Sequence, residues 1–92
     1  MKATLQAHFG FHGDGCRSTA RTEIEIAFTP SADIGISIAP WGDAKKPKRI
    51  SYDVETETFD LFFGVEECDT KDQRHALAED YRAFNWTVDE AG

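Results

Sequence analysis

The chain has 92 residues, of which 40% are hydrophobic and 12% aromatic. It can therefore bury one small core, which excludes both full disorder and a second domain. Ten basic against 17 acidic side chains give a formal net charge of −7, which excludes a basic nucleic-acid-binding domain.

No apolar run approaches the roughly 18 residues of a membrane span, and the N-terminus lacks the apolar stretch of a signal peptide. We therefore expect one cytoplasmic domain, residues 1–92, with Cys16 and Cys68 as free thiols; a disulfide between them is the alternative.

Alternation of apolar with polar or small side chains predicts five β-strands, because this period of two is typical of a half-buried strand. Residues 12–21 contain two glycines and no periodicity, and they predict a loop after the first strand. A short turn at Thr56 and Glu57 makes the last two strands a hairpin. The predicted strands span residues 3–11, 22–29, 34–39, 50–55 and 58–65. The side chains expected to face the core are Leu5, Ala7, Phe9, Phe11, Ile24, Ile26, Phe28, Ile34, Ile36, Ile38, Ile50, Tyr52, Val54, Phe59, Leu61 and Phe63.

The last element predicts a helix from about Lys71 to Phe84, with Asp69 or Thr70 as its N-cap. Its apolar stripe consists of Leu77, Tyr81 and Phe84. Trp86 is expected to pack back on the core, and residues 88–92 are expected to fray. Strands followed by one helix predict an α+β fold, in which the C-terminal helix packs on one face of an antiparallel four- to five-stranded meander.

Charge is unevenly distributed along the chain. Residues 1–50 carry seven basic and five acidic side chains, whereas residues 51–92 carry three basic and twelve acidic ones. A solvated surface that aids solubility is one interpretation of the acidic half, and an acidic patch that meets a basic partner surface is the other. The candidate acidic partner-binding residues are Asp60, Glu66, Glu67, Asp69 and Asp72.

A basic segment precedes the predicted hairpin and has two interpretations of its own. It is either a solvated loop or a set of cations that contact a nucleic-acid backbone held by another protein. Trp41, just before it, would be an interface anchor if exposed and a cap on the core if buried. Phe62, on the outward face of its strand, either packs under the helix or marks an adhesive surface. The candidate basic residues are Lys45, Lys46, Lys48 and Arg49.

Metal and catalytic chemistry have weak signals. The possible zinc ligands are His8, His12, Cys16 and Cys68. They include no Cys-x-x-Cys pair, and the spacing of the first three suits a zinc site only on a helix. A nucleophile at Cys16 or Ser18 would have His12 and Asp14 in the same short loop, where neighbours rarely reach catalytic geometry. We therefore expect a chain that is not an enzyme and has no catalytic residue, cofactor or metal.

Three segments carry a resemblance to a known group of proteins: the start MKATLQAHFGF, the run IAPWGDAKKPKRISYDVE and the end ALAEDYRAFNWTVDEAG. Across all 92 residues the chain resembles the phage-encoded anti-CRISPR proteins that inhibit type I-F systems. This group shares no motif and no fold, so no residue role is transferred.

The resemblance implies immune evasion in the cytoplasm of a bacterial host during bacteriophage infection. Such an inhibitor binds Cas protein subunits of the crRNA-guided surveillance complex, the Csy complex, and blocks target DNA binding by stoichiometric occupancy. Contact with the guide-RNA backbone is compatible with this mode, and neither membrane nor free-DNA binding is expected. The alternative is a small protein-interaction or assembly module that associates with itself through a sheet edge.

Overall fold

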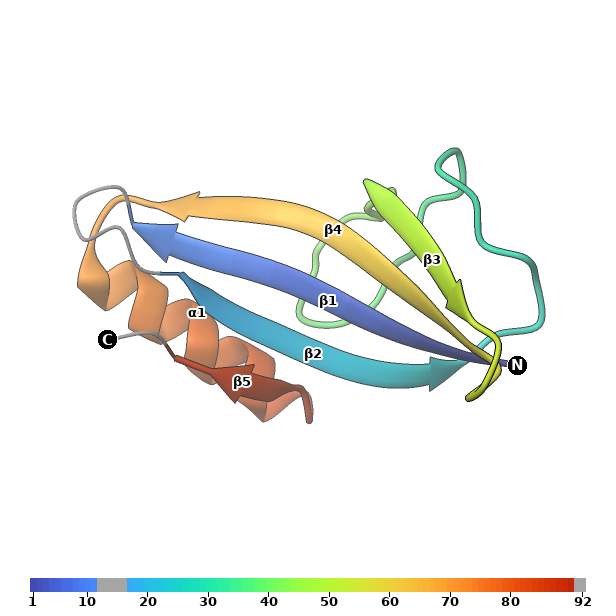
Figure 1. The fold of residues 1–92 in the computed structure, drawn as a ribbon. Helices are drawn as coiled ribbons and strands as arrows, with labels where there is room; N and C mark the ends of the chain where they lie inside the picture. Colours follow the sequence, from blue (N-terminus) through green and yellow to red (C-terminus); the bar gives the residue numbers. More distant parts are fainter. Residues whose placement is uncertain (12–16, 91–92) are drawn as a thin grey trace.

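A computed structural model describes residues 1–11 and 17–90, which form one twisted five-stranded sheet and one helix (Figure 1). The order of the strands in the sheet is β3-β4-β1-β2-β5. The elements are β1 (Lys2–Phe11), β2 (Ser18–Glu25), β3 (Arg49–Asp53), β4 (Thr58–Cys68), α1 (Lys71–Ala83) and β5 (Thr87–Asp89). The predicted α+β class, with a helix packed on one face of the sheet, is therefore confirmed. Among the described residues, no helix is long and apolar enough to cross a bilayer.

One strand pair departs from the expected antiparallel meander. β1 pairs antiparallel with β2 but parallel with β4. The reason is the segment 26–48, which carries the chain from one side of β1 to the other before the β3–β4 hairpin begins. A parallel pair needs a crossover connection of this kind. β1 thus becomes the central strand, with neighbours along its full length on both sides.

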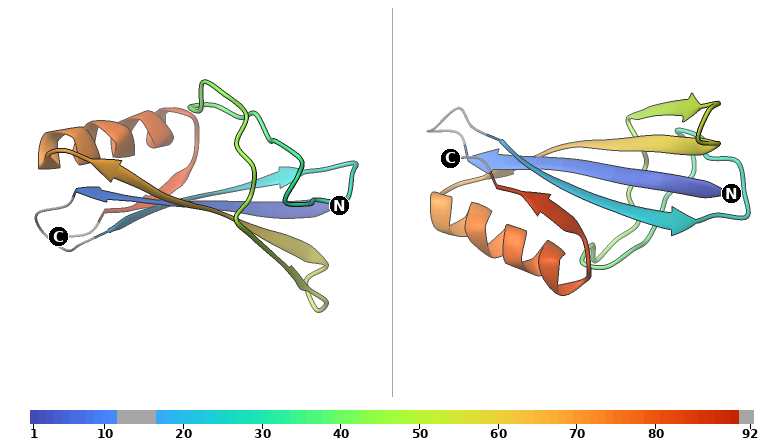
Figure 2. Two further views of the ribbon diagram at one scale, coloured as in Figure 1. Left: turned by 90° about the horizontal axis from the view of Figure 1, so that it is seen from above. Right: turned by 60° about the horizontal axis from the view of Figure 1, so that its bottom comes forward.

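The predicted strand at residues 34–39 is wrong. Its ladder consists of a single bridge, in which the Ile36 and Lys45 backbones exchange hydrogen bonds of 2.8 and 2.9 Å. The segment 26–48 instead crosses the sheet on the same side as α1 (Figure 2). Ile36 is buried there, whereas Ile34 is 39% exposed. The segment therefore contacts the core through Ile36 without pairing as a strand.

Two further boundaries differ from the expectation. β2 begins at Ser18, inside the predicted loop, and ends at Glu25, before the predicted end at residue 29. The first half of β2 has no apolar alternation in the sequence, because its buried residues, Ser18 and Ala20, are small and only weakly hydrophobic. The tail was expected to fray, but β5 pairs with Thr19–Arg21 of β2.

The helix begins and ends as its local sequence predicts. Thr70 is the N-cap, and its side-chain oxygen accepts a hydrogen bond of 3.1 Å from the Gln73 backbone. Ala78 is completely buried, which allows the helix axis to approach the sheet closely. Phe84 is 53% exposed and does not belong to the buried stripe, because Asn85 (φ 68°) turns the chain and Trp86 reaches the core instead. The predicted packing of Trp86 is confirmed.

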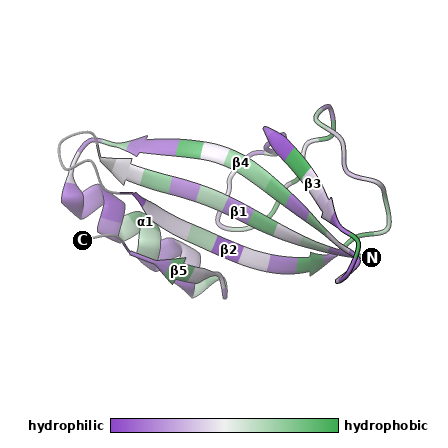
Figure 3. Ribbon diagram, viewed as in Figure 1, coloured by the Kyte–Doolittle hydropathy of each residue, from purple (hydrophilic) through white to green (hydrophobic). Residues whose placement is uncertain are grey.

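The sheet has one covered and one open face. Hydropathy alternates along β1 (Figure 3), and its apolar set lies under α1 and the segment 26–48. The buried core includes Ala3, Leu5, Phe9, Ala20, Leu61, Phe63, Tyr81 and Trp86. Near the β3–β4 turn the cover is incomplete: Tyr52, Val54 and Phe28, all expected in the core, are 47%, 77% and 40% exposed. The second face carries polar side chains and is open to solvent.

Candidate functional site

Trp41 lies in the core, which fits its interpretation as a cap and not as an exposed interface anchor. Its Nε1 donates a 2.9 Å hydrogen bond to Tyr81 Oη, and its ring contacts those of Phe63 and Trp86 at 4.7 and 5.4 Å. Trp86 Nε1 donates a 2.8 Å bond to the Ala39 carbonyl. The two indoles therefore fasten the segment 26–48 to the helix and β4.

The basic residues gather at the outer edge of β4, where β3 begins. Lys48 N–H donates a 2.7 Å bond to the Phe62 carbonyl, and its side chain lies against Gly64, which adopts φ +95° at a bulge in β4. Lys45 Nζ sits 5.1 Å from the Trp41 ring centroid, and Lys46 is exposed. Beyond this point β4 has an outer edge that no described strand pairs.

Four of the five acidic candidates cluster at the end of β4 and the start of α1. With Asp80 they form what we call the acidic surface, made of Glu66, Glu67, Asp69, Asp72 and Asp80. Glu66, Glu67 and Asp80 line one shallow hollow of about 260 Å³. All five are exposed, and none forms an ion pair with any residue that the structure describes. The fifth candidate, Asp60, lies apart from them on the open face.

The open face carries a row of side chains that sequence reasoning did not assemble. Cross-strand pairing places them directly opposite one another on neighbouring strands. We call it the central row; it consists of Arg49, Phe62, Gln6, Arg21 and Thr87, from β3 to β5. Beside it is a hollow of about 500 Å³ lined by Gln6, His8, Arg49, Ser51, Asp60, Leu61 and Phe62. The structure thus brings Arg49 and Asp60 together with Phe62, which was considered as an adhesive surface, and with Gln6 and Ser51, which had no predicted role.

His8 completes the aromatic part of the open face. Its ring meets the Phe62 ring edge-on at 5.1 Å, and its Nε2 lies 3.0 Å from Gln6 Nε2. Burial lowers the pKa of His8, and the positive charges of Arg17 and Arg49 lower it further. The surroundings of His8 are thus electropositive, although the chain is acidic as a whole.

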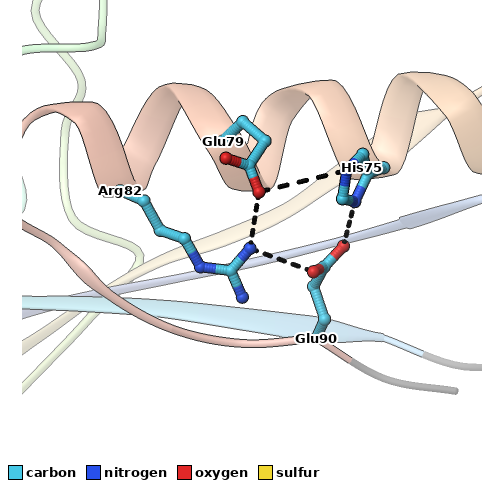
Figure 4. A network of polar contacts seen from close by, with 4 residues as sticks. All are labelled: His75, Glu79, Arg82 and Glu90. Carbon is cyan, nitrogen blue, oxygen red and sulfur yellow. Dashed lines mark hydrogen bonds and ion pairs between the residues drawn. The ribbon is translucent and has the colours of Figure 1, made fainter.

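A charged network joins the helix to the last strand (Figure 4). Arg82 Nη1 donates bonds of 2.9 and 3.0 Å to Glu79 and Glu90, and His75 Nδ1 lies 3.0 Å from Glu90. His75, Glu79 and Glu90 are close enough to share a metal ion. The Arg82 guanidinium, however, already supplies a cation to both carboxylates, so the cluster serves to hold β5 against α1.

This network makes stability depend on pH. Bonds from His75 and Arg82 lower the pKa of Glu90. The Glu90 carboxylate therefore stabilises the fold fully at a pH above the ordinary glutamate pKa. This stabilisation is lost as the pH falls through the lowered pKa. At pH 7 we expect Glu90→Gln to lower the melting temperature by about 2–5 °C. The difference from the parent should shrink below about pH 4. Thermal scans at both pH values test this; Glu55→Gln, exposed and unpaired among the described residues, is the control, and an equal loss in it would contradict the assignment.

The structure tests only part of the zinc and nucleophile hypotheses. His12, Asp14 and Cys16 lie outside the described residues. Cys68 is a free thiol, which agrees with the expected reduced state and not with the disulfide alternative. His8 lies on the open face, whereas Cys68 is buried under the helix on the other face, so the two do not converge. Burial raises the pKa of the Cys68 thiol, as does the nearby Glu66 carboxylate, which keeps Cys68 a poor nucleophile at neutral pH.

No family model, curated protein or solved structure matches this chain.

Proposed function

We propose that this chain is a non-enzymatic phage inhibitor, an anti-CRISPR protein that binds a crRNA-guided type I-F surveillance complex and blocks target DNA binding. The resemblance described above supplies the partner. The observation that carries the mode of action is the acidic surface, whose five carboxylates are exposed and make no ion pair with the described residues. Carboxylates in this state are available to the basic side chains with which Cas subunits hold target DNA.

The distribution of paired and unpaired acids supports this choice of surface. Glu23, Glu79 and Glu90 have cationic partners at 3.7, 2.9 and 3.0 Å, whereas other exposed acids, such as Asp43 and Glu55, are unpaired among the described residues. What distinguishes the end of β4 is that several unpaired like charges line one hollow, at the cost of mutual repulsion. A basic partner surface would relieve this repulsion on binding, which makes the association strong and sensitive to salt.

The basic edge next to the acidic surface supports a second contact. Lys45 and Glu66 line the same hollow of about 190 Å³, together with Val65. Cations and carboxylates therefore follow each other along the outer edge of β4. We propose that the acidic surface meets a Cas subunit and that the lysines contact the guide-RNA backbone or an acidic subunit edge.

Reversing two charges of the acidic surface tests the proposal. We expect Glu66→Lys with Glu67→Lys to weaken binding to an assembled type I-F guide-RNA complex at least tenfold. The measurement is competition with labelled target DNA, after co-elution in size-exclusion chromatography. Asp43→Lys with Glu55→Lys changes the net charge equally and alters exposed carboxylates elsewhere, so it should leave binding within about twofold. Equal losses in both variants would contradict this choice of surface, and no binding by the parent would contradict the proposed function.

The unpaired outer edge of β4 favours a second candidate, an assembly module that adds a strand of a second copy. The bulge at Gly64 and the charges of Glu66 and Glu67 oppose this pairing, because both features disrupt or repel an incoming strand. Light scattering separates the two functions. A monomer at micromolar concentration agrees with the inhibitor, and a dimer that Val65→Pro abolishes would favour the assembly module.

A further inference from the structure

We propose that the central row of the open sheet face binds a short segment of single-stranded RNA, with a base stacked on Phe62. This inference concerns a different surface from the acidic one and does not depend on the proposed function. It rests on three features of the face: the placement of aromatic rings, the state of the arginines and the chemistry of the hollow beside them.

Aromatic rings lie side by side on the two strands in the middle of the sheet. Phe62 of β4 and His8 of β1 meet at 5.1 Å with their planes at 81°. The Arg49 guanidinium lies over the Phe62 ring, 5.1 Å from its centroid, and so adds a planar cation to this aromatic pair. Rings on the central strands of an open sheet, together with guanidinium planes, are the surface on which unpaired bases stack.

Two arginines flank this stacking surface without being neutralised. Arg49 pairs in register with Phe62, and Arg21 pairs with Gln6 on the far side. Three strand spacings separate the two arginines, about 14 Å. Neither makes an ion pair with any described residue, although acidic side chains are in excess in the chain. Both cations therefore lack a neutralising carboxylate among the described residues and can meet phosphates of a strand that crosses the row.

The hollow beside Phe62 offers polar groups to a nucleotide. Gln6 presents an amide, which can both donate to and accept from a base edge. Asp60 and Ser51 face each other across β3 and β4, and their oxygens can accept from a ribose 2′-hydroxyl. The Asp60 carboxylate would repel a phosphate but suits this hydroxyl, which favours RNA over DNA.

The same charges argue against other occupants. An acidic peptide would pair with the arginines, but it has no planar ring that would stack on Phe62 or fill the hollow. A duplex hides its bases within the stack, and the Asp53 carboxylate at one end of the face would repel its second strand. A single strand that crosses the central row avoids this carboxylate. We therefore infer a short, unpaired RNA segment as the occupant.

Fluorescence anisotropy with a labelled ten-nucleotide single-stranded RNA tests the proposal at low salt. We expect measurable binding by the parent and a loss of about 5- to 100-fold in Phe62→Ala, the range for removal of one stacking ring. Arg49→Gln should weaken binding and lower its salt slope by about one ion. Tyr52→Ala and Lys71→Gln remove an exposed ring and an exposed cation outside the central row, and should leave binding unchanged.

A second measurement keeps the proposal falsifiable if Phe62→Ala fails to fold. On addition of the same RNA to the parent, we expect the His8 imidazole signals to shift in NMR spectra, while the buried indole signals of Trp41 and Trp86 stay in place. Absence of binding, unchanged binding by a folded Phe62→Ala, or movement of the indoles without His8 would overturn the proposal. Equal binding of duplex RNA, of the matching DNA strand or of an oligoglutamate would overturn the choice of single-stranded RNA.

Discussion

Replacement of Trp41 by alanine should lower the free energy of unfolding by about 3–5 kcal/mol, the cost of removing a large buried ring. Trp41 contacts the rings of Phe63 and Trp86 and donates its indole hydrogen to Tyr81. Without it, the segment 26–48 loses its main attachment to the helix. A loss of this size is a large fraction of the 5–15 kcal/mol that holds a domain folded. Urea unfolding followed by far-ultraviolet circular dichroism measures it.

Two variants separate ring packing from the hydrogen bond and from nonspecific effects. Trp41→Phe keeps an aromatic ring but leaves the Tyr81 hydroxyl without its donor, and we expect a loss of about 1–3 kcal/mol. Phe84→Ala removes a ring that is 53% exposed at the end of the same helix, and it should cost only about 0.5 kcal/mol. If Trp41→Ala costs no more than Phe84→Ala, Trp41 does not belong to the core, and a role on a partner surface would have to be considered again.

Elements whose signals are local were predicted well. Alternation located β1 and most of β4, and the threonine before an acidic first turn located the start of α1. These features depend on the chain within a few residues, where strand period and helix capping act. Segment 34–39 shows the limit of this reasoning. Its isoleucines alternate with small residues as in a strand, yet only Ile36 is fully buried and Ile34 is 39% exposed, so alternation alone does not establish pairing with a strand.

Elements that depend on distant partners were missed. β5 has one partly buried apolar residue, Val88, and exists because β2 offers it an edge at Ala20. The parallel pairing of β1 with β4 depends on the path of the segment 26–48 across the sheet. Loop paths of this kind leave no periodic signal in the sequence, so neither the strand order nor the parallel pair could be derived from it.

The candidate surfaces also differ in whether they depend on residues that are close in sequence or far apart. Residue type and position along the chain sufficed to group Glu66, Glu67 and Asp69, because they are close in sequence. The central row needs the register of four strand pairs, which brings Gln6 beside Phe62 only through the parallel pairing. Burial of Trp41 likewise depends on a tertiary contact with Tyr81, 40 residues away. Sequence reasoning therefore grouped charged residues that are close along the chain but could not say which distant residues share a surface.

Phe9 and Phe62 offer a direct test of the two faces of the sheet, and the effects of their removal should differ severalfold. Phe9 lies on the covered face of β1, is completely buried, and stacks on Tyr81 at 5.6 Å with 24° between the planes. Phe9→Ala should therefore cost about 3–5 kcal/mol, because the helix and the central strand cannot both move to fill the void.

Phe62→Ala on the open face should cost only about 1 kcal/mol, because water already reaches the ring and no packed layer covers it. Urea unfolding of both variants, followed by circular dichroism, measures the difference. Equal losses would mean that the open face is packed against something in the native protein and would remove the basis for a free binding surface. A large loss for Phe9 beside a small one for Phe62 would leave Phe62 without a structural reason to be aromatic, and binding would remain as the reason for its ring.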